Sequence, residues 1–366
     1  MKLNYNWKLA DGYPPLTRGK VFSCFACGGG STMGYKLAGF DVIGCNEIDP
    51  RMMEAYKANH GPKFSYLEDI RIFKNRTDLP EELYALDILD GSPPCSSFSV
   101  AGAREDGWGV EKKFREGQTS QILDTLFFDF VDLAKKLQPK VVVAENVKGL
   151  LMGEAREYYK KISFAFEDAG YEIQDFLLNA ADMGVPQKRE RVFYIGIRKD
   201  LAEPFMEQAN LFYRKPKINL EFNETRIKFK DIMDTNASER VKINESIIPA
   251  YEYCMAEKTS DFAKYYEETT GKRKYFNTIL IFLESVVSTI KGDCTHVIEG
   301  TMAYMNDTEI KRAGSFPGDY NFLNNKVDYL VGMSVPPLMM ARIANEIWEQ
   351  WLSKINTPCT PKTNLL

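Results

Sequence analysis

The strongest constraint on the fold is a regular alternation of strand-like and helix-like segments across the first 200 residues. Apolar runs that read as buried strands fall at 21–25, 41–45, 86–89, 141–144 and 192–197. Helical patterns lie between them, and the clearest is the amphipathic segment 122–137. Such alternation is typical of a mostly parallel sheet covered by helices. We therefore predict an α/β domain that binds its ligand at the carboxyl ends of the strands.

The pattern changes after residue 198, which indicates a second unit. Residues 201–307 lack clean alternation and are rich in aromatic residues, so we predict a smaller domain or a large insertion there. Residues 308–366 are predicted to return to the first domain, with a C-terminal helix at 336–351 that begins with proline and has one apolar face. The first domain is then expected to comprise residues 1–200.

Composition excludes several classes of protein. The chain has 47 basic and 51 acidic residues, a net charge of −4, and no basic tail, so charge alone argues against a nucleic-acid partner. Its two histidines make a His-rich metal site or a His-centred triad unexpected, and no metal site is predicted. The odd number of cysteines, seven, and a polar N-terminus favour a reduced, cytoplasmic protein. The apolar stretch 276–290 is too short to span a membrane.

A glycine-rich turn follows the first predicted strand. Gly28, Gly29 and Gly30 open the next helix, where a backbone without side chains lets a ligand approach. A dinucleotide fingerprint would need glycine where Met33 stands. Glu47 ends the second strand and is suited to two ribose hydroxyls, although a plain tight turn with a surface glutamate fits the same pattern.

Two further segments carry reactive groups at predicted strand ends. Pro93 and Pro94 stiffen the chain before Cys95, which favours an accessible nucleophile over a buried filler thiol. Glu145 leaves the valine-rich strand 141–144 and would lie near Cys95 in a doubly wound sheet, where it could act as an acid or cap a helix.

A charged segment leads into the strand at 192–197. Arg189 and Arg191 should point to one side of this strand, and two guanidinium groups suit an anion or a base carbonyl. Taken alone, this segment also reads as a solvated strand start.

Together and in this order, these segments resemble the DNA (cytosine-5) methyltransferase family of bacteria and phages. The family's F-x-G-x-G-G loop is similar to residues 25–30, its P-C loop to 94–95, its E-N-V to 145–147, its Q-x-R-x-R to 187–191, and its S-F-P-D-D-F and G-N-S-V-P-P segments to 315–320 and 332–337. The resemblance covers about residues 20–200 and 308–352. Cys27, Ser96 and Met333 depart from the usual Gly, Gln and Asn, and none of these is a catalytic position.

The resemblance implies a Rossmann-like, S-adenosylmethionine-dependent methyltransferase domain, with residues 201–307 as target-recognition domain. Cys95 would add to C6 of cytosine, so that C5 can attack the methyl group. Glu145 would bind N3 and the amino group, Arg191 the base O2, and Arg189 would help to hold the site. The residues expected to bind the cofactor are Phe25, Gly28, Gly29, Gly30, Glu47, Ile48, Asp69, Ile70, Pro94, Leu126, Ser334 and Val335.

The resemblance also predicts partners. The substrate would be double-stranded DNA with the target base flipped out of the helix, and residues 100–119 would form a loop that closes over it. A monomer near the nucleoid is expected, with a cognate restriction endonuclease that acts on the same DNA site as a partner.

Four alternatives remain open from the sequence. The same chemistry on tRNA is the nearest, but the Cys-Phe-Thr signature of that branch is absent. An amino-methylating enzyme would need an aromatic residue where Cys95 stands. A nicotinamide oxidoreductase conflicts with the glycine spacing, and a non-catalytic DNA-binding relative would be expected to lose Cys95 or Glu145.

Overall fold

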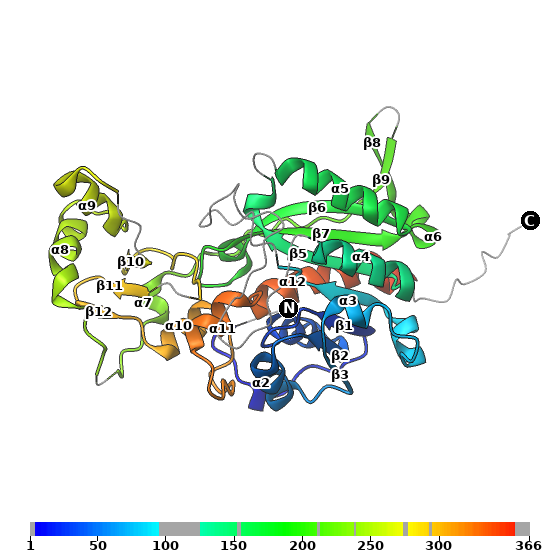
Figure 1. Cartoon of the computed structure of the whole chain (residues 1–366), viewed down its shortest axis with the longest axis horizontal. Coiled ribbons are helices and arrows are strands. Elements are labelled where there is room, and N and C mark those ends of the chain that lie inside the picture. Colours follow the sequence, from blue (N-terminus) through cyan, green and yellow to red (C-terminus); the bar gives the residue numbers. More distant parts are fainter. Residues whose placement is uncertain are drawn as a thin grey trace, which may run out of the picture.

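One seven-stranded sheet organises the larger part of the computed structural model, which describes residues 4–94, 125–151, 155–210, 213–237, 239–273, 277–292 and 295–355. The strand order is β3-β2-β1-β4-β5-β7-β6 (Figure 1). The strands are β1 (Lys20–Cys24), β2 (Asp41–Glu47), β3 (Phe64–Leu67), β4 (Ile88–Gly91), β5 (Val141–Val147), β6 (Tyr171–Asn179) and β7 (Glu190–Arg198). The five strands from β3 to β5 pair in parallel, and β7 runs antiparallel between β5 and β6.

The strand order reverses between β1 and β4, which are hydrogen-bonded neighbours although β2 and β3 lie between them in sequence. Chains leave a doubly wound sheet in opposite directions at such a point, and a crevice forms at the carboxyl ends of the two strands. The glycine turn follows β1 and the proline turn follows β4, so both chemically interesting segments meet at this crevice.

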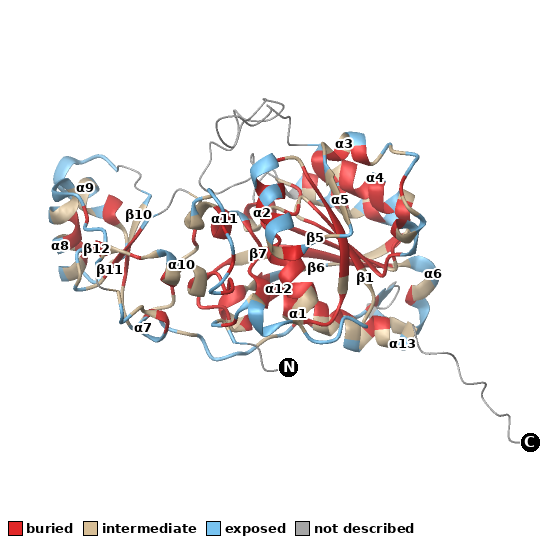
Figure 2. Cartoon of the chain, turned by 90° about the horizontal axis from the view of Figure 1, so that it is seen from below, coloured by how far each residue is buried: buried red, intermediate tan, exposed pale blue. Residues whose placement is uncertain are grey.

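Helices cover both faces of the sheet. One face carries α1 (Gly30–Leu37) and α12 (Pro337–Ile347), and the other carries α3 (Ile70–Phe73), α4 (Leu126–Leu137) and α5 (Ala155–Asp168). The helix α2 (Pro50–His60) begins with proline and is capped by Asp49, whose side chain accepts from the backbone of Arg51 and Met52. Figure 2 shows the buried strands enclosed between the helical layers.

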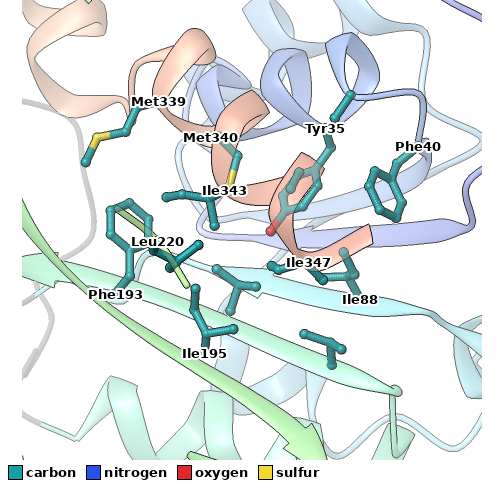
Figure 3. Packing of buried hydrophobic residues seen from close by; sticks show 14 of the residues in the cluster. Tyr35, Phe40, Ile88, Phe193, Ile195, Leu220, Met339, Met340, Ile343 and Ile347 are labelled. Carbon is teal, nitrogen blue, oxygen red and sulfur yellow. The ribbon is translucent and has the colours of Figure 1, made fainter. Parts of the chain in front are cut away.

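The C-terminal helix completes the core beside α1. Its apolar residues Met339, Met340, Ile343 and Ile347 pack over the sheet with Tyr35 (Figure 3). The helix continues as η8 (Trp348–Leu352) and α13 (Ser353–Ile355).

The described residues of 201–210 and 213–222 pack with the sheet rather than with the smaller unit. Ala202, Ile218 and Leu220 belong to the same buried cluster as α12, and Figure 3 shows Leu220 against Phe193. This segment contains α6 (Lys199–Ala202), η6 (Glu203–Phe205), β8 (Met206–Asn210) and β9 (Tyr213–Pro216). The predicted domain boundary at residue 201 stays a prediction, and the described residues just after it contribute to the core of the sheet domain.

The smaller lobe, residues 239–306, has a core of its own. It contains η7 (Glu245–Ile247), α8 (Ile248–Ala256), α9 (Phe262–Thr270), β10 (Thr278–Ile281), β11 (Thr295–Ile298) and β12 (Ala303–Tyr304). Ile243, Tyr251, Phe262, Leu280 and Val297 form its apolar centre. The short α7 (Phe229–Ile232) lies on the link from the sheet domain, which we define as residues 4–222 and 307–355.

A shared apolar cluster joins the two units. It combines Met33 and Met52 of the sheet domain with Ile281 and Ile298 of the lobe, and it includes residues around α10 (Asp307–Ala313) and α11 (Val327–Met333). Trp7 from the N-terminal arm belongs to it and donates from its indole N–H to the carbonyl of Ser315, 2.9 Å away. The arm is thus anchored to the segment 315–320. The remaining short helices of the sheet domain are η1 (Leu9–Asp11), η2 (Glu81–Ala85), η4 (Lys148–Leu151) and η5 (Ala180–Met183).

Candidate active site

A pocket lies at the carboxyl ends of β1, β2, β3 and β4. The described residues that line it are Phe25, Cys27, Asn46, Glu47, Ile48, Asp49, Met52, Glu68, Asp69, Ile70, Ser92, Pro94, Leu126, Tyr329 and Met333. Seven residues predicted to bind the cofactor are among them: Phe25, Glu47, Ile48, Asp69, Ile70, Pro94 and Leu126. The fold therefore brings these residues from five separate segments to one place.

A smaller cavity adjoins this pocket beneath the start of α1. Gly30, Ser334 and Val335, also predicted from the sequence, line it together with Ser23 and Asp90. Phe25, Cys27, Ser92 and Met333 line both spaces. The C-terminal G-M-S-V segment therefore meets the first glycine turn, although about 300 residues separate them in sequence.

The glycines of the turn are required by the protein's own packing. A Cβ atom on Gly30 would lie 2.2 Å from the carbonyl oxygen of Val335, and one on Gly29 would lie 2.2 Å from Nε2 of His60. Gly29 also has a φ of 82°, which L-residues with side chains rarely adopt. Gly28 and Gly29 are not among the residues that line either cavity. A Cβ atom on Gly28 would lie 2.5 Å from the Leu330 side chain, so for these two glycines the structure gives a packing reason where the sequence suggested ligand approach.

Glu47 is held at the mouth of the pocket by backbone groups. Its carboxylate accepts hydrogen bonds from the backbone N–H of Cys27, Ile48 and Asp49 at 2.7–2.9 Å. Burial raises the pKa of Glu47, and these hydrogen bonds oppose that rise because they favour the charged form. The result is a fixed carboxylate that presents its remaining lone pairs to a ligand.

Asn46 and Asp69 shape the next wall of the pocket. The Asn46 amide donates to the carbonyls of Tyr66 and Glu68, which ties the ends of β2 and β3 together. Asp69 caps α3 and pairs with Arg71 at 2.5 Å. Burial acts to raise the pKa of Asp69, but the hydrogen bonds from Arg71 outweigh it and the pKa is lowered.

An ion pair joins the ends of β5 and β7. The Arg191 Nε atom lies 2.9 Å from Oε1 of Glu145, and both side chains are largely buried. Burial lowers the pKa of Arg191, while the carboxylate of Glu145 acts to raise it. Glu145 lies within β5, which runs to Val147, three residues beyond the strand predicted from the sequence.

Asn146 connects this pair to the proline turn. Its side-chain amide donates to the carbonyl oxygen of Pro93 at 3.2 Å, and its own Oδ1 accepts from the N–H of Val147. Because Pro93 lies two residues before Cys95, this contact tethers the start of the Cys95 loop next to Glu145. Cys95 itself and the loop 100–119 lie outside the described residues.

The Arg189 side chain is buried where the sheet domain meets the smaller lobe. It is 3% exposed and donates to the carbonyl oxygens of Ile290 at 3.2 Å and Gly332 at 2.9 Å. Burial and the neighbouring charge of Arg191 lower the pKa of Arg189 to about 9, so the guanidinium stays protonated at neutral pH. Arg189 thereby joins the start of β7 to Ile290, which lies between β10 and β11 of the smaller lobe, and to the end of α11.

The comparison with known families agrees with this geometry. The model of the C-5 cytosine-specific DNA methylase family matches residues 19–349. The chain belongs to the C-5 cytosine-specific DNA methylase family.

Curated relatives of this family are similar over parts of their length. The Type II methyltransferase M.FnuDI of Fusobacterium nucleatum is 36% identical over 236 residues, which is 63% of each chain. M.NgoPII of Neisseria gonorrhoeae is 38% identical over 57% of this chain and 56% of its own. This chain therefore spans about three fifths of the length of these two relatives. M1.HphI of Haemophilus parahaemolyticus is 30% identical over 88% of this chain and 85% of its own.

Solved structures share the fold across almost the whole chain. A protein assigned as a prophage-encoded DNA modification methyltransferase (E. coli) aligns with a TM-score of 0.62 at 20% identity, over 90% of this chain and 99% of that one. The S. pombe Dnmt2 methyltransferase aligns with a TM-score of 0.58 at 16% identity, over 93% and 100%. At this identity the likeness concerns the fold, and it agrees with the methyltransferase fold predicted from the sequence.

Several residues of this pocket were not predicted. Tyr329 and Met52 reach the pocket from α11 and α2, and nothing in their local sequence signals this. Asp90 could have been suspected, because an acidic residue inside an apolar strand is unusual. Within the described residues no group of three or more His, Cys, Asp or Glu side chains could hold a metal ion, and no helix there is both long and apolar enough to cross a membrane.

Proposed function

We propose that this chain transfers a methyl group from S-adenosylmethionine to C5 of cytosine in duplex DNA, with Cys95 as the nucleophile. The observation that carries the proposal is the Asn146–Pro93 hydrogen bond, which tethers the turn before Cys95 beside the Glu145–Arg191 pair. Family membership supports the reaction type, and the curated relatives described above are DNA methyltransferases by name.

Each reactive group has a chemical task. The Cys95 thiolate adds to C6 of the base, which makes C5 nucleophilic. Once C5 has taken the methyl group, the C5 proton is lost to a base and the Cys95–C6 bond breaks, which releases the thiolate. The Glu145 carboxyl binds N3 and the exocyclic amino group and stabilises the addition, while Arg191 binds the O2 atom. A base inside the duplex is not accessible to such groups, so it must leave the helix at a cost of about a few kcal/mol. Arg189 holds the junction and does not touch the base.

The pocket fits S-adenosylmethionine, which supplies an electrophilic methyl group when it is bound. Phe25, Ile70 and Leu126 form apolar walls for an adenine ring, and Glu47 accepts from ribose hydroxyls. Among the described lining residues four are acidic and none is basic. That charge favours a cationic cofactor over a dinucleotide whose diphosphate is negative, which argues against the oxidoreductase alternative.

The smaller lobe is proposed to read the DNA sequence. It has its own core and lies beside the crevice, joined to the sheet domain through α10 and α11. We expect a monomer to act on one duplex, and a restriction endonuclease of the same specificity as a partner, because relatives carry the Type II designation.

Bisulfite sequencing of DNA from a host that expresses the chain tests the reaction, the nucleic acid and the site together. We expect one short sequence to become resistant to conversion at a single cytosine. The same host expressing Cys95→Ala should show no protection. Protection of tRNA but not DNA, or full protection by Cys95→Ala, would overturn the proposal.

A further inference from the structure

Asp90 is a buried carboxyl group below the start of α1. It lies on β4 directly opposite Ser23 of β1 and is 1% exposed. Its Oδ2 accepts from the Ser23 hydroxyl at 2.8 Å and its Oδ1 from the Tyr35 hydroxyl at 3.2 Å. The Ser31 side chain also hydrogen-bonds to it. Asp90 therefore ties two central strands to the helix that carries the glycine turn.

No cation balances this carboxyl group. In the part of the chain that the structure describes, no Lys, Arg or His side chain forms an ion pair with Asp90. Burying a carboxylate without a countercharge costs free energy. Such a group therefore either stays protonated or is stabilised when a cation binds nearby. Burial raises the pKa of Asp90 to about 7, the negative charge of Glu145 adds to this, and the hydroxyl hydrogen bonds oppose it.

The other ionisable groups that face Asp90 carry no positive charge that could neutralise its carboxylate. Cys24 on β1, Tyr35 on α1 and Tyr56 on α2 all have pKa values raised well above the ordinary range by burial, so they are neutral. Glu145 on β5 is paired with Arg191. Near neutral pH, Asp90 is thus the group whose charge changes.

The cavity places Asp90 within the cofactor site. Asp90 lines the small space under Gly30, and Phe25, Cys27, Ser92 and Met333 line both this space and the larger pocket. We propose that Asp90 is a charge-selecting residue, whose carboxylate favours the cationic S-adenosylmethionine over the product S-adenosylhomocysteine. The inference rests on the proposed function, because it assigns a specificity role within the same site.

The two ligands differ by one positive charge, since loss of the methyl group turns a sulfonium into a neutral thioether. Attraction to a carboxylate across a poorly solvated pocket changes affinity by about tenfold at separations near 10 Å. The ionised Asp90 would strengthen binding of the methyl donor and give no such help to the product. Selective binding of this kind speeds the exchange of product for fresh cofactor.

Calorimetric titration of the full chain with each ligand between pH 6 and pH 8.5 tests the inference. For the wild type we expect the ratio of the product Kd to the cofactor Kd to rise about tenfold with pH. Asp90→Asn should keep the low value of this ratio at every pH, because the amide still accepts hydrogen bonds but cannot ionise. Titration of the ligands' own amino groups is common to all variants and cancels in the comparison.

Two control variants separate charge from packing. Ser23→Ala removes a hydrogen bond to Asp90 without removing its charge, and Asp87→Asn changes a buried carboxyl paired with Lys140 at the opposite end of the same strand region. Asp87→Asn should leave the rise of the ratio with pH unchanged, whereas Ser23→Ala should keep the rise but move it to higher pH, because the lost hydrogen bond no longer opposes the raised pKa of Asp90. An Asp90→Asn variant with the wild-type ratio and pH dependence would overturn the inference.

A flat ratio in the wild type would overturn it as well, even if Asp90→Asn did not fold. Failure of the wild type to bind S-adenosylmethionine at all would instead contradict the proposed function.

Discussion

The sheet domain and the smaller lobe differ in how their buried residues are arranged. The sheet domain buries large clusters on both faces of seven strands, and its pocket is lined from the ends of four of them. The lobe buries a small cluster between two helices and three short strands, and two of those strands have four residues each (Figure 2). The sheet domain can therefore hold side chains rigidly in place, whereas the surface of the lobe is supported by few buried contacts.

This difference suggests a division of labour. A methyl transfer needs groups held to within fractions of an ångström, and strand ends supply that precision. Reading a DNA sequence depends on side chains that differ between relatives with different targets, and a small lobe tolerates such change. The predictions below test whether each variant affects one unit and leaves the other intact.

The largest expected effect is on how the free energy of unfolding of the sheet domain changes with pH. Because the pKa of Asp90 is raised from its unfolded value to about 7, its contribution to stability is present at low pH and lost as pH rises through 7. The amide introduced by Asp90→Asn cannot ionise. The free energy of unfolding of this variant, measured relative to that of the wild type, should therefore increase by about 3 kcal/mol between pH 5 and pH 8. Urea unfolding at the two pH values measures this, and an advantage that does not change with pH would refute it.

Next in size is the ion pair that anchors the lobe. Arg240 binds both carboxylate oxygens of the fully buried Glu309, at 2.6 and 2.8 Å. Arg240→Met leaves that carboxylate without its partner and should lower stability by about 3 kcal/mol. DNA binding should weaken, whereas affinity for S-adenosylmethionine should stay within about twofold.

An exposed pair of the same lobe provides the control for Arg240. Arg273 pairs with Asp261 and Glu267 at the surface, so Arg273→Ala should leave the melting temperature nearly unchanged. Equal losses in Arg240→Met and Arg273→Ala would show that the buried pair has no special role.

A smaller free-energy change is expected at the reactive end of β5. Glu145→Gln retains size but loses the carboxylate, and single-turnover methyl transfer should fall about a hundredfold. Glu190→Gln is the matched control, because Glu190 pairs with Lys148 at the surface and should show a normal rate. Cofactor binding and DNA affinity should persist in both. A normal rate for Glu145→Gln would remove Glu145 from the chemistry.

The smallest effect is expected at Met333, which lines the pocket but is 43% exposed. Met333→Ala removes apolar contact area from one side of the ligand, and the Kd for S-adenosylmethionine should rise about threefold. Fluorescence or calorimetric titration measures this. A loss above about thirtyfold would mean that Met333 is a principal contact.

Much of the sheet domain could be predicted from the sequence, because each of its main strands is marked by a short apolar run and by the residues that follow it. The apolar runs that became β1, β2, β4 and β5 are followed by glycine, proline or acidic residues, and the ends of β1, β2 and β4 mark the pocket. The strand β6 was missed, because it lies at the sheet edge and its half-exposed residues mix polar and apolar side chains without a clear period.

The lobe and the long-range contacts could not be predicted in this way. Leu220 belongs to the sheet core although its neighbours in sequence look irregular, so its place in the fold could not be predicted from the local pattern. Arg189 binds carbonyls about 100 and 140 residues away, and such partners leave no trace in a local pattern. Tertiary packing decides these features, and only the fold reveals them.

The central claim is that Cys95 attacks a cytosine at this site. Incubation of the full chain and S-adenosylmethionine with a duplex that carries 5-fluorocytosine in the target sequence, followed by peptide mass spectrometry, tests it most directly. We predict a stable adduct on the peptide that contains Cys95, and no adduct with Cys95→Ala. A wild-type protein that methylates normal DNA yet forms no adduct, or forms it on another residue, would contradict the claim.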